Sequence, residues 1–313
     1  MQRRLPKYRR APDAISPLGL TERSVAIIET VGRYRFIGTR KLVQLVAGNE
    51  DVTHRHLQNL YHRDLISRLT LPRKGNKGEF IYFLDNASAL RNLLGRPDGD
   101  EAVFDWDQIK ANREKYSEQK VGGDQDGFGR YLFLRHELMI SDFHANIELA
   151  CRASSGRVEL EKWAQGPALW NRVKAPSGLT LPHRPDAFFS LRFPDAPAGQ
   201  QRSNFLYEAD RNTSNATRMK QKLEAHLYFL IQARHVHAFG IKKVRAVIVE
   251  TITDERVAQC KEIAADLVAK ETPLAAFLFW FTTSAKLTGK DANSPFAPVW
   301  ESAADERARS LLD

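Results

Sequence analysis

The sequence has few of the features that would cross-link a chain or anchor it in a membrane. Its 313 residues include only two cysteines, Cys151 and Cys260, too few by themselves for a disulfide framework or a zinc site. The longest apolar run, 275–281, is far shorter than the ~18–20 residues of a membrane span. The basic first residues lack the apolar stretch of a signal peptide, and no Gly-Lys-Ser/Thr phosphate loop indicates an ATPase. We therefore expect a soluble, cytoplasmic protein with no membrane contact.

The basic residues are unevenly distributed along the chain. Hydrophobic residues make up 42% of the sequence, which is enough for a sizeable core, and the length predicts two domains. The net charge is +9, yet residues 1–90 carry 16 basic and 8 acidic side chains, against 31 and 30 in residues 91–313. An excess of one sign confined to one module indicates a polyanionic partner, with nucleic acid ahead of an acidic membrane surface. The alternative is a charged surface that only aids solubility.

The first third of the chain predicts a small helical domain preceded by an arm. Residues 1–18 are rich in Arg, Lys and Pro and are expected to form a flexible basic arm. Apolar residues at helical spacing predict three helices, and two strand-like runs flank a Gly-rich basic turn. The predicted helices span 21–34, 39–46 and 52–64, and the predicted strands span 65–70 and 79–84. Thr21 is the expected N-cap of the first helix.

Three short helices followed by a basic hairpin are typical of a winged helix-turn-helix, here expected over 19–85. The polar face of the third helix carries groups that contact base edges and phosphates, namely Thr53, His54, Arg55, Gln58, Asn59 and Arg63. The hairpin tip adds Arg73, Lys74 and Lys77. We expect these residues to bind double-stranded DNA. The alternative is that a small helical domain gives the same pattern, or that the module binds protein.

The rest of the chain predicts a linker and a larger α/β domain. Glycine-rich and charged stretches suggest a linker over 86–130, followed by a domain over 131–313. In that domain, a long helix precedes three strands, and a helix, a strand, a helix and a last strand follow, an order that favours a mixed α/β sheet. The strands are expected at 157–163, 186–193, 204–210, 244–250 and 275–282, and the helices at 131–152, 215–233 and 253–270.

Acidic residues flank a predicted hairpin of this sheet. Asp186 begins one strand, and Glu208 and Asp210 end the next, so an antiparallel pairing would bring the three carboxylates to one end. Converging carboxylates often hold a hard cation such as Mg²⁺ or Mn²⁺, which can polarise a phosphodiester. The alternative is that acids simply collect at exposed strand ends. His144 and His226 are interpreted as ordinary helix residues.

Both modules also resemble known proteins. Pro185-Asp186 and Glu208-Ala-Asp210 are similar to the Pro-Asp…Asp/Glu-X-Lys motif of a nuclease superfamily. Over residues 18–302 the chain resembles the replication-relaxation family of plasmid, phage and integrative-element proteins. The matching stretches are the winged helix, His136-Glu-Leu-Met-Ile, Pro185-Asp-Ala-Phe, Tyr207-Glu-Ala-Asp-Arg-Asn-Thr213, Lys222-Leu-Glu-Ala, 244–250, and Phe277-Leu-Phe with Pro295 and Trp300.

This resemblance implies a DNA-binding first module joined to a restriction-endonuclease-like domain that acts in replication, relaxation or their regulation. Asp186 and Glu208 would hold the metal ion, and Asp186, Glu208, Asp210 and Lys222 would form the catalytic set. The sequence departs from the motif at Asp210, where the superfamily has lysine, and Lys222 or Lys220 is expected to supply the missing ammonium. The chain is then either a DNA-binding protein that does not cut or an active metal-dependent endonuclease. A homodimer and replication or mobilisation proteins are further expected partners.

Overall fold

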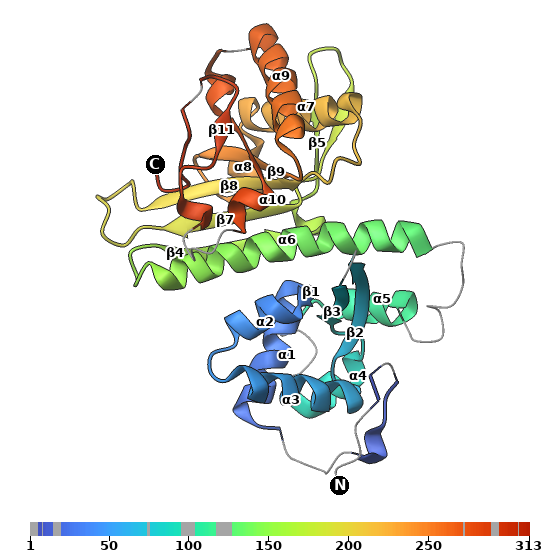
Figure 1. The fold of residues 1–313 in the computed structure, drawn as a ribbon. Coiled ribbons are helices and arrows are strands. Elements are labelled where there is room, and N and C mark those ends of the chain that lie inside the picture. Colours follow the sequence, from blue (N-terminus) through green and yellow to red (C-terminus); the bar gives the residue numbers. More distant parts are fainter. Residues whose placement is uncertain are drawn as a thin grey trace. The chain divides into compact units, whose positions relative to one another are not determined.

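The computed structural model describes residues 6–7, 9–14, 20–73, 76–94, 104–116, 127–271, 273–288, 294–305 and 307–313. The chain divides into two compact units, Met1–Ala145 and Asn146–Asp313, called the first and the second unit (Figure 1). The boundary falls inside helix α6 (Gly127–Ala153), whereas the sequence suggested a boundary near residue 130. Within the described residues, no helix is long and apolar enough to cross a membrane.

The first unit contains the three predicted helices and the predicted hairpin. The helices are α1 (Glu22–Tyr34), α2 (Thr39–Leu45) and α3 (Glu50–His62), and the strands are β1 (Phe36–Gly38), β2 (Ser67–Arg73) and β3 (Asn76–Phe83). The strands form an antiparallel sheet in the order β1-β3-β2. Strand β1 was not predicted, because three residues are too few to show an alternating pattern.

Side-chain caps set the starts of two helices. The Thr21 hydroxyl accepts a hydrogen bond from the Ser24 amide at the start of α1, which confirms the predicted N-cap. The Asn49 side chain accepts from the Val52 amide, so α3 begins at Glu50, two residues earlier than the apolar spacing suggested. Asp64 has a φ of 59°, outside the helical range, and α3 has ended before it.

The N-terminal segment departs from the expected flexible arm at Arg10. The Arg10 guanidinium pairs with Asp64 at 3.0 Å, donates to the Ser67 hydroxyl at 2.5 Å and lies over the Tyr61 ring. The amide of Ala11 donates to His62 Nδ1 at 3.1 Å. These contacts hold Arg10 against the end of α3, so this cation is part of the folded unit. Residues 1–5, 8 and 15–18 of the expected arm lie outside the described residues.

Part of the expected linker also belongs to the first unit. Helices α4 (Ala87–Leu94) and α5 (Trp106–Tyr116) lie within 86–130. The Tyr116 ring packs edge-on against Phe36 and Phe83, with ring centroids 5.6 Å apart in each pair. Asn112 donates from Nδ2 to the Leu84 carbonyl at 2.9 Å. The sequence obscured this packing because the apolar residues of α5 are sparse among charged ones.

The second unit is built on a mixed sheet, as the sequence predicted, but the sheet has six strands where five were expected, because the two-residue strand β11 was not predicted. The strands run in the order β11-β10-β9-β8-β7-β4, where β8, β9 and β10 are parallel neighbours and the other pairs are antiparallel. They are β4 (Glu159–Gln165), β7 (Ala187–Arg192), β8 (Arg202–Ala209), β9 (Ala246–Thr251), β10 (Phe279–Thr283) and β11 (Glu301–Ser302). A separate hairpin, β5 (Asn171–Lys174) with β6 (Thr180–His183), was not predicted.

Helices α7 (Ala216–Ile231) and α9 (Asp254–Glu271) pack against one face of this sheet. The shared core contains Phe188, Leu206 and Val249 from the strands, with Leu223 and Val257 from the helices. Figure 1 shows α7 and α9 on the same side of the strands. The unit is completed by the short helices α8 (Arg234–Phe239) and α10 (Ser284–Leu287). The 3-10 turns among the residues that the structure describes are Pro12–Ala14, Pro167–Leu169, Pro273–Phe277 and Ser294–Phe296.

Candidate functional site

The β7–β8 hairpin brings the predicted carboxylates to one end of the sheet. Ala187 pairs with Tyr207 across the hairpin, and the Asp186 amide donates to the Tyr207 carbonyl at 3.1 Å. The Asp186 carboxylate in turn accepts from the amide of Ala209 at 2.8 Å. Asp186 is half-buried, whereas Glu208 and Asp210 are 2% and 4% exposed. The three acids therefore lie within one small region, at the sheet end where β7 begins and β8 ends.

Glu208 is held by two residues of α7. Its carboxylate accepts from Lys222 Nζ at 2.5 Å and from His226 Nε2 at 2.8 Å. Lys222 and His226 are four residues apart, so one face of the helix presents both to the same carboxylate. Lys222 thus reaches the acidic cluster as expected, while Lys220 is paired with Glu224 at 4.0 Å.

The acids act together on the Lys222 ammonium. Burial works against its charge, but the negative charges of Glu208, Asp186 and Asp210 outweigh it and raise the pKa of Lys222 above its ordinary value. Its side chain is still 39% exposed, so a ligand at the sheet end could approach the ammonium. Lys222 is therefore a fixed cation between buried acids and solvent.

A second buried histidine, His183, contacts His226. His226 Nδ1 and His183 Nε2 are 3.0 Å apart, and His183 stacks on Phe229 with ring centroids 3.8 Å apart. Burial and the neighbouring His226 lower the pKa of His183 to about 2, so His183 stays neutral. An ionised carboxylate only accepts hydrogen bonds, so His226 Nε2 donates to Glu208. His226 is thus part of the site, and the interpretation of it as an ordinary helix residue is wrong.

Asp210 has a cation of its own that the sequence analysis missed. Arg256 donates from Nε to the Asp210 carboxylate at 2.6 Å and from Nη2 to the Ser214 carbonyl at 2.8 Å. Both side chains of this pair are at least 92% buried. Arg256 stands in the first turn of α9, where the helix dipole disfavours a cation. That misplaced charge is the signal that would have pointed to a buried acidic partner.

A fourth acid, Glu250, lies on the neighbouring strand β9 but on the other face of the sheet. Glu250, at the end of β9, pairs in register with Ala209. Its carboxylate accepts from the Tyr207 hydroxyl at 2.7 Å and the Ser284 hydroxyl at 2.5 Å. Tyr207 and Glu208 are adjacent in β8 and point to opposite faces, so Glu250 is separate from the carboxylate cluster.

The donor set fits a metal ion only in part. Among the described residues, no group of three or more His, Cys, Asp and Glu side chains is arranged to hold a metal ion. Asp210 is engaged by Arg256, which leaves Asp186 and Glu208 as the two oxygen donors that face Lys222. Both Glu208 oxygens already accept hydrogen bonds, so a divalent ion at this position would compete with Lys222.

The predicted DNA-binding residues of α3 differ in their exposure to solvent. His54 and Arg55 are exposed, and Gln58, Asn59 and Arg63 are half-buried. Thr53 is fully buried, and its hydroxyl accepts from Arg23 at 2.6 Å, so it does not belong to the exposed face. Lys74 and the side chains of Arg73 and Lys77 lie outside the described residues.

Comparison with known families adds one finding. A family model described as replication-relaxation matches residues 28–241, more than half of the 313 residues. The matched range begins in α1 and includes the three acids, Lys222 and His226. Arg256 lies outside it. Neither the curated proteins nor the solved structures contain a significant match to this chain.

The Asp210–Arg256 pair gives a direct test of the cluster. Replacing Arg256 with Met should destabilise the second unit by about 3–5 kcal/mol, because Asp210 is left buried without its cation. Adding Asp210→Asn should recover part of that loss, with a coupling of roughly 1–3 kcal/mol in the double-mutant cycle. Urea unfolding of the full chain measures these free energies.

The matched control is Arg202→Met. Arg202 pairs with Glu161, and the two side chains are 58% and 29% exposed, so its loss should cost no more than about 1 kcal/mol. Similar losses for Arg256→Met and Arg202→Met would show that the Asp210 pair is not buried as described.

Proposed function

Because the chain belongs to the replication-relaxation family, we propose that it binds double-stranded DNA through its first unit and acts in the replication or relaxation of a plasmid, phage or integrative element. In this proposal the protein binds DNA and does not cut it. The second unit then contributes DNA contact or assembly with replication or mobilisation proteins.

The element order of the first unit carries this proposal. Helices α1, α2 and α3 precede the β2–β3 hairpin, and β1 joins the sheet at the far side of β3. This order supports a winged helix-turn-helix, in which the third helix enters the major groove and the hairpin tip contacts the phosphate backbone. The strongly basic balance of residues 1–90 is consistent with such a partner.

The exposed face of α3 supports the same reading. His54 and Arg55 are exposed, and Gln58 and Asn59 follow one turn later on the same side. Arg55 forms no ion pair with any residue that the structure describes. A guanidinium in that position can bind a phosphate or a guanine edge without first breaking an internal contact.

Arg55 and the hairpin tip test the DNA-binding role. The Arg55→Ala and Lys74→Ala double variant should bind duplex DNA more weakly than the wild type, because two cations near the phosphates are lost. The slope of log affinity against log salt should fall by about one for each lost phosphate contact. Fluorescence anisotropy with a labelled duplex, measured over a range of salt concentrations, gives both values.

Lys110→Ala is the matched control, since Lys110 is an exposed lysine that belongs to α5 and not to α3 or the hairpin. It should leave the salt slope nearly unchanged. If Lys110→Ala weakens binding as much as Arg55→Ala, affinity follows net charge and not this face. An unchanged affinity in the double variant would remove the winged-helix assignment.

A second candidate function is that of a metal-dependent endonuclease, and Lys222 is the observation that favours it. The Pro185-Asp186 and Glu208-Ala-Asp210 segments resemble a nuclease motif that ends in lysine, and Lys222 Nζ lies 2.5 Å from Glu208. In this reading Asp186 and Glu208 hold Mg²⁺ or Mn²⁺, and Lys222 stabilises charge on the phosphate. The bound ion would polarise the phosphodiester and activate water.

Metal binding is expected to raise the melting temperature of the wild type as Mn²⁺ is added, because the ion binds only the folded state. Asp186→Asn should abolish the shift. Lys222→Met should enlarge it, since the ammonium no longer competes for Glu208. Differential scanning fluorimetry of the full chain measures these shifts.

Asp195→Asn serves as control, because Asp195 is exposed in the β7–β8 turn and should not alter the shift. A wild-type melting temperature that does not respond to Mn²⁺ or Mg²⁺ would rule out the metal site and the endonuclease with it. A shift without nicking of supercoiled plasmid would leave a DNA-binding protein that holds a metal ion.

A further inference from the structure

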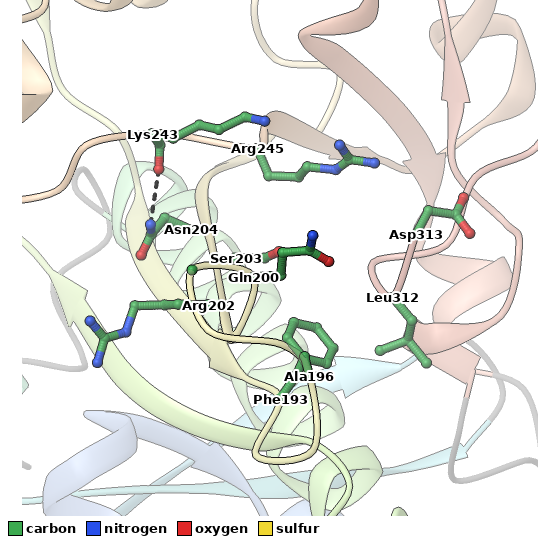
Figure 2. A pocket seen from close by; sticks show the side chains of 11 residues that line it. Phe193, Ala196, Gln200, Arg202, Ser203, Asn204, Lys243, Arg245, Leu312 and Asp313 are labelled. Atoms are coloured by element: carbon green, nitrogen blue, oxygen red, sulfur yellow. Dashed lines mark hydrogen bonds between the residues drawn. The ribbon is translucent and has the colours of Figure 1, made fainter.

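A pocket lies at the other end of the β7–β8 hairpin from the carboxylate cluster. It has a volume of about 420 Å³ and is lined by the turn after β7, the start of β8, the segment before β9 and the last two residues of the chain. Figure 2 shows Lys243 and Arg245 extending in the same direction over this space, with the Gln200 amide below them. None of these residues belongs to α3 or to the carboxylate cluster.

Buried polar side chains hold the backbone of the segment that carries Lys243 and Arg245. Lys243 and Arg245 are two residues apart in an extended segment, so they point to the same side, while Val244 between them is buried. Asn204 donates from Nδ2 to the Lys243 carbonyl at 2.9 Å, and its own carbonyl accepts from the Arg245 amide at 2.7 Å. Ser190 in turn donates to Asn204 Oδ1 at 2.7 Å. Asn204 therefore holds the backbone at both Lys243 and Arg245.

These cations differ from Lys222 and Arg256 in that no carboxylate of the described residues lies within ion-pair distance of them. Lys222 and Arg256 are paired with Glu208 and Asp210, but neither Lys243 nor Arg245 is in an ion pair with any residue that the structure describes. Arg202, also at this pocket, is paired with Glu161 and points away from the space (Figure 2). Two neighbouring positive charges that have no ion-pair partner attract an anion to the pocket.

The other residues that line the pocket indicate which groups the ligand carries besides an anion. Phe193 is half-buried and Leu312 is 43% exposed, so an apolar surface lies next to the cations. Asp313, near Leu312, accepts from the Ser310 amide at 3.0 Å and presents a carboxylate to the pocket. A carboxylate there favours a ligand with hydroxyl or amino donors, as a sugar or a base supplies. The volume is in the range of small-molecule sites, roughly 300–1,000 Å³.

We propose that this pocket binds a nucleoside phosphate, with the phosphate on Lys243 and Arg245 and the nucleoside against Phe193, Leu312 and Asp313. The nucleotide comes either from solution or from a DNA strand that crosses the second unit. This site goes beyond the proposed DNA contacts of α3, and its occupation does not depend on them.

Isothermal titration of the full chain with deoxyadenosine 5′-monophosphate tests the site. The nucleotide should bind more tightly than inorganic phosphate or deoxyadenosine, because each of these lacks half of the contacts. Lys243→Gln and Arg245→Gln should each weaken nucleotide binding by about tenfold, the loss expected for one charge-assisted hydrogen bond. Lys242→Gln, which removes the same charge from an exposed neighbour outside the pocket, should leave it unchanged.

A competing single-stranded oligonucleotide distinguishes the two sources. Displacement of the mononucleotide from the wild type identifies a strand as the ligand, and its failure to compete identifies a free nucleotide. Arg55→Ala should not change nucleotide binding, which separates this site from DNA binding by α3. No saturable binding of the nucleotide, or equal losses in Lys242→Gln and Arg245→Gln, would overturn the proposal.

Discussion

The buried contact between Glu208 and two residues of α7 is the interaction on which the second unit depends. Glu208 is 2% exposed, and a carboxylate so far from water is tolerated only when it is paired and hydrogen-bonded. Lys222 supplies the charge, and His226 supplies the second hydrogen bond. Because both come from α7, the same contact that neutralises the acid also sets how α7 packs on the sheet. Asp210 and Arg256 repeat this arrangement for α9.

This internal pairing explains how three acids can share one end of a sheet. Mutual repulsion would otherwise oppose folding, but Lys222 and Arg256 offset it with charges of the chain itself. At the other end of β8 the balance is reversed, since Lys243 and Arg245 face a pocket with no ion pair among the described residues. The two ends of β8 therefore differ: the acids at one end are paired with cations of the chain, and the cations beside the other end can bind a ligand.

The sequence predicted the parts of this site that depend on local pattern. Strand-like runs identified β7, β8 and β9, and the two-residue alternation put Glu208 and Asp210 on one face. The resemblance to a nuclease motif that ends in lysine indicated Lys222 of the following helix. The contacts of His183 with His226 and of Asp210 with Arg256 join residues more than 40 positions apart, and they depend on how helices dock on the sheet. Thr53 was misjudged for the same reason, because Arg23 of a different helix buries it.

Nitrogen NMR of the imidazole rings in the full chain tests the buried network most directly. Burial and His226 lower the pKa of His183 to about 2, and Glu208 accepts from His226 Nε2. Between roughly pH 5 and 8, where an exposed histidine titrates, His183 should therefore remain neutral. A His183 that titrates near the ordinary value of about 6.5 would contradict the account.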